Sequence, residues 1–107
     1  MPIKQTPLLV ILVSLFLSLQ VQADIVNVEI NKFKFIPQQL IVKVGDTVIW
    51  TNKEKRQYHS VWFKTLTAIE PDYFFPEETY QRTFNKVGTF NYECGPHPKM
   101  KGLIVVK

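Results

Sequence analysis

Apolar side chains recur at every second position through most of the chain from residue 26 onward, and this alternation restricts the fold more than any other feature. A period of two is typical of strands that bury one face, and Pro37 and Gly45 lie where turns must separate successive runs. After residue 23, no long stretch of sequence shows the apolar stripe of a helix. At most one helical turn fits within residues 65–72. The pattern therefore predicts an all-β sandwich of about seven to eight short strands. The expected strands contain Val26 to Ile30, Phe33 and Phe35, Leu40 to Val44, Val48 and Trp50, and residues 58–63, 79–84, 89–94 and 103–106.

Aromatic residues on the expected strands supply most of the expected core. The positions assigned to it are Phe33, Phe35, Trp50, Phe84 and Phe90. Trp62 and Phe63 are adjacent, so we expect one of them to face inward and the other to face solvent or a loop. Residues 64–78 break the alternation with acidic side chains around an aromatic run, and we interpret them as a long connection.

The N-terminal segment has the pattern of a secretory signal peptide. Lys4 supplies a positive charge, residues 8–19 form an apolar stretch, and Ala23 ends a small-residue cleavage site. A membrane anchor needs about 20 apolar residues, and polar residues interrupt this stretch too early. We therefore expect a signal peptide of residues 1–23 and a single soluble domain of residues 24–107 in the periplasm.

Composition excludes several classes of protein. With 46% hydrophobic, 13% aromatic and 21% charged residues, the chain is too apolar for a disordered tail and too charged for a membrane bundle. The net charge of +4 comes from scattered basic residues, so nothing favours nucleic-acid binding. Cys94 is the only cysteine, so no disulfide can form within the chain. Its thiol is either buried and inert or held by something as a thiolate.

Three side chains with metal-binding atoms recur at three-residue intervals in one predicted loop. These are Cys94, His97 and Met100, and His59, the only other histidine, lies on the expected strand 58–63. Two imidazoles, one thiolate and a weak axial thioether form the ligand set of blue-copper sites, because soft sulfur favours Cu(I) and imidazole suits both oxidation states. Each residue alone has a simpler explanation as core or surface. Together they predict one copper ion per chain bound by His59, Cys94, His97 and Met100.

The predicted ligand loop also has the composition of a rigid loop. Pro96 and Pro98 flank His97, and each proline fixes its own φ and restricts the residue before it. A stiff loop keeps the ligand geometry similar in both copper oxidation states, which favours rapid electron transfer. The expected docking edge is the surface around His97, and the basic side chains expected near it to attract an acidic partner are Lys99, Lys101, Lys53, Lys55 and Arg56.

These motifs resemble the plastocyanin/amicyanin group of cupredoxins over almost all of residues 24–107. The two-residue gap between His97 and Met100 resembles amicyanins more than plastocyanins, whose ligand loop is longer. The resemblance implies the cupredoxin fold, a Greek-key β-sandwich, with one type 1 copper and one-electron shuttling in the periplasm. The matching positions include Val28, Ile30, Phe33, Phe35, Pro37, Leu40, Val42, Gly45, Asp46, Thr47, Val48, Trp50, Asn52, His59, Val61, Gly88, Thr89, Phe90, Tyr92, Cys94, Pro96, His97, Pro98, Met100 and Gly102.

Two features depart from that family pattern. Ser60 stands where many members have an asparagine that ties two loops together beside the thiolate. Residues 53–63 are more charged and bulkier than the usual approach to the first histidine ligand, and they resemble cupredoxins associated with copper tolerance.

These observations predict a periplasmic electron carrier that works between redox partner proteins, with a copper-tolerance or copper-binding cupredoxin as the alternative. An enzyme is not expected, because Cys94 and His97 lack an orienting residue for nucleophilic catalysis and Met100 would have no role. A structural zinc site would recruit a further Cys, His or carboxylate in place of Met100. We expect a monomer that binds no nucleic acid and does not insert stably into the membrane after signal cleavage.

Overall fold

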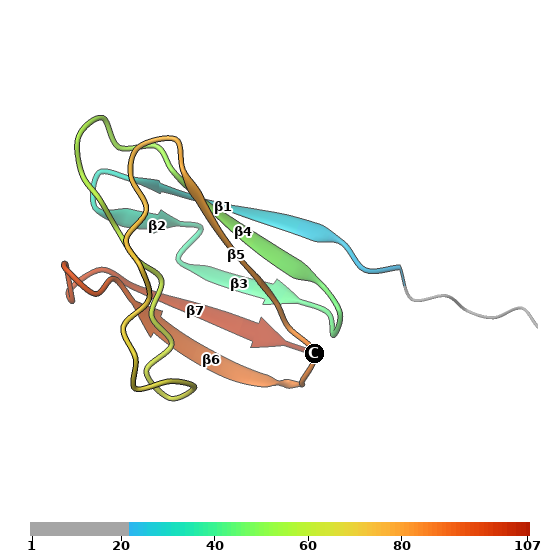
Figure 1. Ribbon diagram of the computed structural model, residues 1–107. Helices are drawn as coiled ribbons and strands as arrows, with labels where there is room; N and C mark the ends of the chain where they lie inside the picture. The colour runs from blue at the N-terminus through green and yellow to red at the C-terminus, as the bar shows by residue number, and fades with distance from the viewer. Residues whose placement is uncertain (1–21) are drawn as a thin grey trace, which may run out of the picture.

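The computed structural model describes residues 22–107, which form two packed sheets (Figure 1). The first sheet has the order β2-β1-β4-β5 and the second has the order β3-β7-β6. The all-β sandwich expected from the alternation is confirmed. The strands are β1 (Ile25–Asn31), β2 (Lys34–Ile36), β3 (Gln39–Val42), β4 (Thr47–Asn52), β5 (Thr79–Thr83), β6 (Gly88–Glu93) and β7 (Lys101–Val106).

The structure describes little of the N-terminal segment. The expected signal peptide, residues 1–23, lies outside the described residues except for its last two positions, and it stays a prediction. Across residues 22–107, no helix has the length and apolar character needed to cross a membrane.

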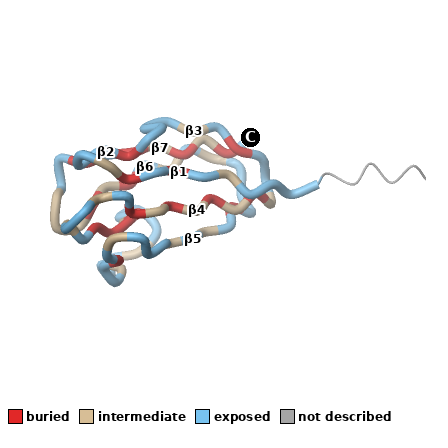
Figure 2. The backbone as a smooth tube through the Cα atoms, turned by 90° about the horizontal axis from the view of Figure 1, so that it is seen from above, coloured by how far each residue is buried: buried red, intermediate tan, exposed pale blue. Residues whose placement is uncertain are grey.

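The core forms where the inward faces of the two sheets meet. β1 pairs with β4 in parallel, and this register places Val28 opposite Trp50, both of them fully buried. Every second position along β4 and β7 is buried, and most of the positions between are intermediate, as Figure 2 shows. The indole Nε1 of Trp50 donates a hydrogen bond of 3.2 Å to the hydroxyl of Tyr92 on β6, so one polar contact joins the two sheets inside the core. Burying each large apolar side chain contributes roughly 1.5–3 kcal/mol.

The expected strand over residues 58–63 does not form. The segment makes only two isolated bridges, one between His59 and Phe74 and one between Trp62 and Glu93. Its first part therefore bonds to the connection after residue 63, and its second part bonds to β6. Because the two ends bond to different elements, no continuous ladder can form along the segment.

Phe33 is the one expected core aromatic that lies at the surface. Its side chain is 45% exposed, and both Phe33 and Lys32 have positive φ angles, of 57° and 51°. This left-handed pair makes the turn between β1 and β2 and interrupts the strand alternation, so Phe33 leaves the inward face. The other four positions fit the prediction: Phe35, Trp50 and Phe84 are buried, and Phe90 is partly buried against the core.

The connection over residues 64–78 crosses one end of the sandwich, as expected. It begins after Phe63, which is buried, while its neighbour Trp62 is half-buried and donates from Nε1 to the carbonyl of Thr67 at 3.1 Å. The expected inward and outward faces of this aromatic pair are therefore confirmed. The connection lies at the end of the sandwich opposite the C-terminus, together with the β1–β2 turn and the β6–β7 loop (Figure 1).

Candidate metal centre

The loop between β6 and β7 is closed by its own backbone. The N–H of Cys94 donates to the carbonyl of Met100 at 3.0 Å, and the N–H of Met100 donates to the carbonyl of His97 at 2.9 Å. These bonds place Cys94 and Met100 next to each other where the two strands end, with His97 at the tip between them. The prolines on either side of His97 restrict the backbone further.

His59 is held in place by a neighbouring segment. Its backbone exchanges two hydrogen bonds with Phe74, of 3.1 and 2.9 Å. The side chain of Asn52, which is fully buried, donates to the carbonyl of Phe74 at 3.1 Å and to the carbonyl of Gln57 at 2.7 Å. The side-chain amide of Asn52 therefore fixes both the backbone just before His59 and Phe74, the residue that pairs with His59. The imidazole of His59 is completely buried.

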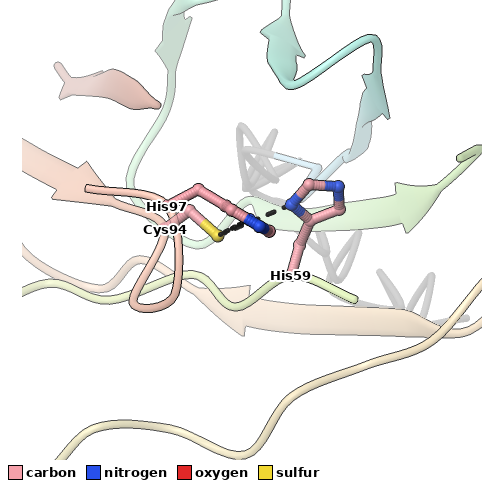
Figure 3. A group of neighbouring side chains, drawn as sticks. All are labelled: His59, Cys94 and His97. Atoms are coloured by element: carbon pink, nitrogen blue, oxygen red, sulfur yellow. Dashed lines mark hydrogen bonds between the residues drawn. The ribbon is translucent and has the colours of Figure 1, made fainter. Parts of the chain in front are cut away.

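Three side chains from these segments converge on one point (Figure 3). The Nδ1 atom of His59 lies 3.5 Å from the Sγ atom of Cys94, and Nδ1 of His97 lies 3.6 Å from the same sulfur. Their potential ligand atoms all lie within 4.8 Å of one another. Two ligand atoms about 2.0–2.3 Å from a shared ion at a trigonal angle would lie about 3.7 Å apart. The spacing therefore fits a single metal ion.

The sulfur of Cys94 is buried but receives a donor. The backbone N–H of Ser60 donates to Sγ at 3.4 Å. Burial raises the pKa of the Cys94 thiol, and the backbone donors of Ser60 and His97 act against that increase. A buried thiol of raised pKa stays protonated near neutral pH unless a bound cation replaces the proton.

The outer nitrogen of His59 has an acidic neighbour. Nε2 is buried and has no hydrogen-bond partner among residues 22–107, and Oε1 of Glu54 lies 3.6 Å from it. Burial lowers the pKa of His59, which His97 lowers further and Glu54 partly raises. The neutral imidazole, which is the form that binds metals, is thus favoured, and a carboxylate beside the outer nitrogen is a common support for a histidine ligand.

The donor chemistry selects among metals. Two imidazoles and one thiolate suit copper or zinc, and calcium and magnesium prefer oxygen ligands. Structural zinc sites normally have four strong Cys or His ligands, whereas the remaining candidate here is the thioether of Met100. The set therefore fits copper best.

Comparison with known proteins decides the family. The sequence model of a family described as copper binding proteins, plastocyanin/azurin family, matches residues 22–107. The chain belongs to the plastocyanin/azurin family. Amicyanin of Paracoccus denitrificans is 38% identical over 96 residues, covering 86% of this chain and 72% of that protein. Amicyanin-alpha of Methylorubrum extorquens is 41% identical over 85 residues, covering 76% and 71%.

Solved structures agree with this membership in the plastocyanin/azurin family. The structure of a reduced mutant of amicyanin superposes with a TM-score of 0.73 at 36% identity, covering 82% of this chain and 87% of that one. A more distant relative, plastocyanin of Scenedesmus fuscus, is 30% identical over 84 residues, covering 68% of this chain and 86% of that protein. The resemblance to cupredoxins inferred from the sequence is confirmed.

The serine that replaces the family's common asparagine keeps a bond between two loops. The Oγ atom of Ser60 accepts a hydrogen bond of 2.9 Å from the backbone N–H of Gly95. The shorter side chain therefore reaches the ligand loop, and Ser60 contacts that loop twice, through its hydroxyl at Gly95 and through its N–H at Cys94.

The four predicted ligand residues lie at the same end of the molecule. The structure brings His59, Cys94 and His97 together, and Met100 is buried in the loop that also carries Cys94 and His97. Sequence reasoning missed Glu54 as a neighbour of His59, because it lies in a charged run that has the appearance of ordinary surface. Its position five residues before His59 was the only available signal.

Proposed function

We propose that this protein carries single electrons through one copper ion bound by His59, Cys94, His97 and Met100. The proposal depends on one observation, the convergence of two Nδ1 atoms on the buried sulfur of Cys94 at 3.5 and 3.6 Å. When bound there, copper supplies the Cu(II)/Cu(I) couple. Cys94 would provide the thiolate, His59 and His97 would provide the two imidazoles, and Met100 would provide a weak thioether ligand.

The protein's own residues favour rapid electron transfer. Backbone bonds close the ligand loop, and the bridge to Phe74 holds His59, so the ligands keep their positions when the charge of the ion changes. His59 is fully buried, whereas His97 is half-buried. The ring of His97 therefore offers the shortest route for an electron between the centre and the surface.

The surface around His97 supports docking to another protein. Four aromatic side chains at this end are between 41% and 52% exposed, and we call them the aromatic patch: Phe33, Tyr58, Tyr73 and Phe75. The rings of Phe33 and Tyr58 lie 5.0 and 6.2 Å from that of His97, measured between centroids. Exposed aromatic clusters are typical of protein interfaces.

Charges near the aromatic patch favour an acidic partner. Lys32, Lys55, Arg56 and Lys99 are exposed, and none of them forms an ion pair within residues 22–107. A shallow hollow of about 380 Å³ lies among Phe33, His97, Pro98, Lys99 and Met100 and can accept an apolar side chain. The partner we propose is a redox protein that presents an apolar contact ringed by carboxylates.

We also propose a cellular location and an oligomeric state for the mature protein. We place the mature protein in the periplasm as a soluble monomer after removal of residues 1–23, and its role is electron carriage and not catalysis. The N-terminal sequence pattern supports the location, and the surface charges support transient association with a partner.

Electron self-exchange tests this function. The rate between the Cu(I) and Cu(II) forms can be measured from NMR line broadening in mixtures of the two. A carrier gives rapid exchange and reversible voltammetry with one copper per chain. Copper tolerance, the alternative, predicts slow exchange together with copper sensitivity of a deletion strain, and that pair of results would contradict electron carriage.

A further inference from the structure

A carboxylate from the long connection lies against the ligand loop. A Cβ atom built on Gly95 would overlap Oε1 of Glu70 and lie 2.8 Å from its Cδ. Glu70 and the hydroxyl of Ser60, whose Oγ lies 2.8 Å from the same Cβ, therefore occupy the space that a side chain at position 95 would need. Gly95 directly follows Cys94, so the acidic group lies beside the backbone that carries the sulfur ligand.

Tyr73 and Tyr58 hold Glu70 in this place. The hydroxyl of Tyr73 donates to Oε1 of Glu70 at 3.1 Å, and this bond raises the pKa of Tyr73. The ring of Tyr73 stacks on that of Tyr58, with 5.0 Å between centroids and 9° between planes. Tyr58 immediately precedes His59, so the carboxylate is tied to the segments that carry both Cys94 and His59.

The charge of Glu70 is not neutralised by a cation. No lysine, arginine or histidine among residues 22–107 forms an ion pair with it, although other carboxylates of the domain have such partners. Glu70 is one of the groups that raise the pKa of Cys94, after burial as the main cause. The carboxylate lies against the backbone of Gly95, the residue after Cys94, so its negative charge is close to the sulfur ligand although the group is exposed to solvent.

We propose that Glu70 sets the reduction potential of the centre, lowering it by placing a negative charge beside the ligand loop at Gly95. The proposal rests on the proposed copper site and adds to it a residue that provides no ligand atom. A nearby negative charge stabilises Cu(II) more than Cu(I), because the oxidised ion carries one more positive charge. The chain places glycine at position 95, and that choice is what admits the carboxylate.

The test is the reduction potential of copper-loaded Glu70→Gln, measured by voltammetry beside the wild-type protein. Glutamine keeps an oxygen acceptor for Tyr73 and nearly the same shape, so the main change is the charge. We expect the potential to rise, with the ratio of Cu(II) to Cu(I) affinity falling about threefold, as for a partly screened charge. The difference should shrink at high salt, because the group is exposed.

Asp72→Asn is the matched control. It removes the same charge from the same connection, and Asp72 forms no ion pair within residues 22–107 and does not lie against Gly95 as Glu70 does. We expect its potential to stay near the wild-type value. Equal shifts in Asp72→Asn and Glu70→Gln would overturn the proposal, since they would show only a general effect of net charge.

Two further measurements distinguish the effect of the Glu70 charge from a change in the structure of the ligand loop. The visible spectrum of Glu70→Gln and the melting temperature of its metal-free form should match those of the wild-type protein. A changed potential with a changed spectrum would show that Glu70 acts by shaping the loop, which contradicts the proposal. Should Glu70→Gln fail to fold, Glu70→Asp tests the proposal instead. Aspartate is shorter by one methylene and moves the charge away from the ligand loop, so the reduction potential should rise slightly above the wild-type value.

Failure of this inference is distinguishable from failure of the proposed function. If the wild-type protein gives an intense thiolate-to-copper band and a reversible potential that Glu70→Gln does not alter, only the role of Glu70 is wrong. If the wild-type protein gives no such band, the copper site itself is wrong.

Discussion

The ring of Phe33 meets the ring of His97 edge-on, with 5.0 Å between their centroids and 87° between their planes. The backbone N–H of Phe33 also donates to Oε1 of Glu54 at 2.6 Å, and the same oxygen lies 3.6 Å from Nε2 of His59. The β1–β2 turn thus contacts the surroundings of both histidines. An exposed phenyl ring at that position is suited to mediating contact between the centre and another molecule.

Replacing Phe33 with aspartate should slow electron transfer without much effect on stability. The side chain is 45% exposed, so its loss costs little core packing, but a charge beside His97 disrupts the apolar contact between two approaching molecules. We expect the electron self-exchange rate to fall at least about tenfold. Val87→Asp is the control, since Val87 is 64% exposed and precedes β6 far from the β6–β7 loop. An equal effect of both substitutions would argue against docking at Phe33.

Tyr92 should make folding sensitive to high pH. Burial raises the pKa of its phenol from 10.0 to about 12, despite the bond from Trp50. The unfolded chain therefore ionises first, so this contribution to stability is complete below pH 10 and is lost as the pH rises to about 12. The loss reaches at most roughly 2–3 kcal/mol. Urea unfolding across this range should show a smaller decline for Tyr92→Phe than for the wild-type protein.

The same Tyr92→Phe variant should be less stable at neutral pH. It leaves the buried indole N–H of Trp50 without its acceptor, which costs roughly 1–3 kcal/mol. For a domain of this size the melting temperature should fall by about 4–8 °C per kcal/mol. An unchanged melting temperature would show that the bond between the sheets contributes nothing to stability.

Copper should raise the melting temperature, but the metal-free protein should remain folded. A ligand that binds only the folded state stabilises it by mass action, by about 4 kcal/mol at a thousand times its dissociation constant. Most of the buried apolar side chains come from the strands of the two sheets and provide no ligand atom, so we expect the core to form without the metal. Far-ultraviolet circular dichroism with and without a chelator checks both statements. Loss of β structure on chelation would contradict the expectation that the metal-free protein remains folded.

Supplying a further donor to the sulfur should raise the reduction potential. Pro96 has no N–H, and Ser60 provides a donor to Sγ at 3.4 Å. Pro96→Ala adds an N–H in the ligand loop, and a donor that withdraws electron density from the thiolate favours Cu(I). Voltammetry of the copper-loaded variant measures the change. A potential that stays the same or falls, with the loop structure intact, would count against this account of the sulfur.

Local patterns in the sequence predicted the strands but not the segment that carries His59. Val28 and Trp50 could be placed in the core because burial of one sheet face repeats every second residue along a strand. Residues 58–63 have the same alternation, but their hydrogen bonds go to two different elements, and no local pattern encodes that choice. Phe33 was misplaced for a related reason, since the left-handed turn that exposes it has no glycine to signal it.

The proposed metal ligands could be predicted from the sequence more readily than the residues that surround them. Cys94, His97 and Met100 lie in one short loop, so their spacing alone predicts that they meet. Glu54 and Glu70 reach the site through tertiary contacts with Phe33 and Gly95, each more than twenty residues distant in sequence. Such contacts follow from how loops pack at the end of the sandwich, which sequence patterns do not specify.

The visible and EPR spectra of Cys94→Ser beside those of the wild-type protein, each with one equivalent of copper, test the central claim most directly. Cys94 is the only cysteine in the chain, and intense absorption in such sites comes from the bond between thiolate and Cu(II). We expect an intense band and one copper per chain for the wild-type protein, and no intense band for Cys94→Ser. Retention of the band in Cys94→Ser, or its absence from the copper-loaded wild-type protein, would contradict a copper centre built on His59, Cys94, His97 and Met100.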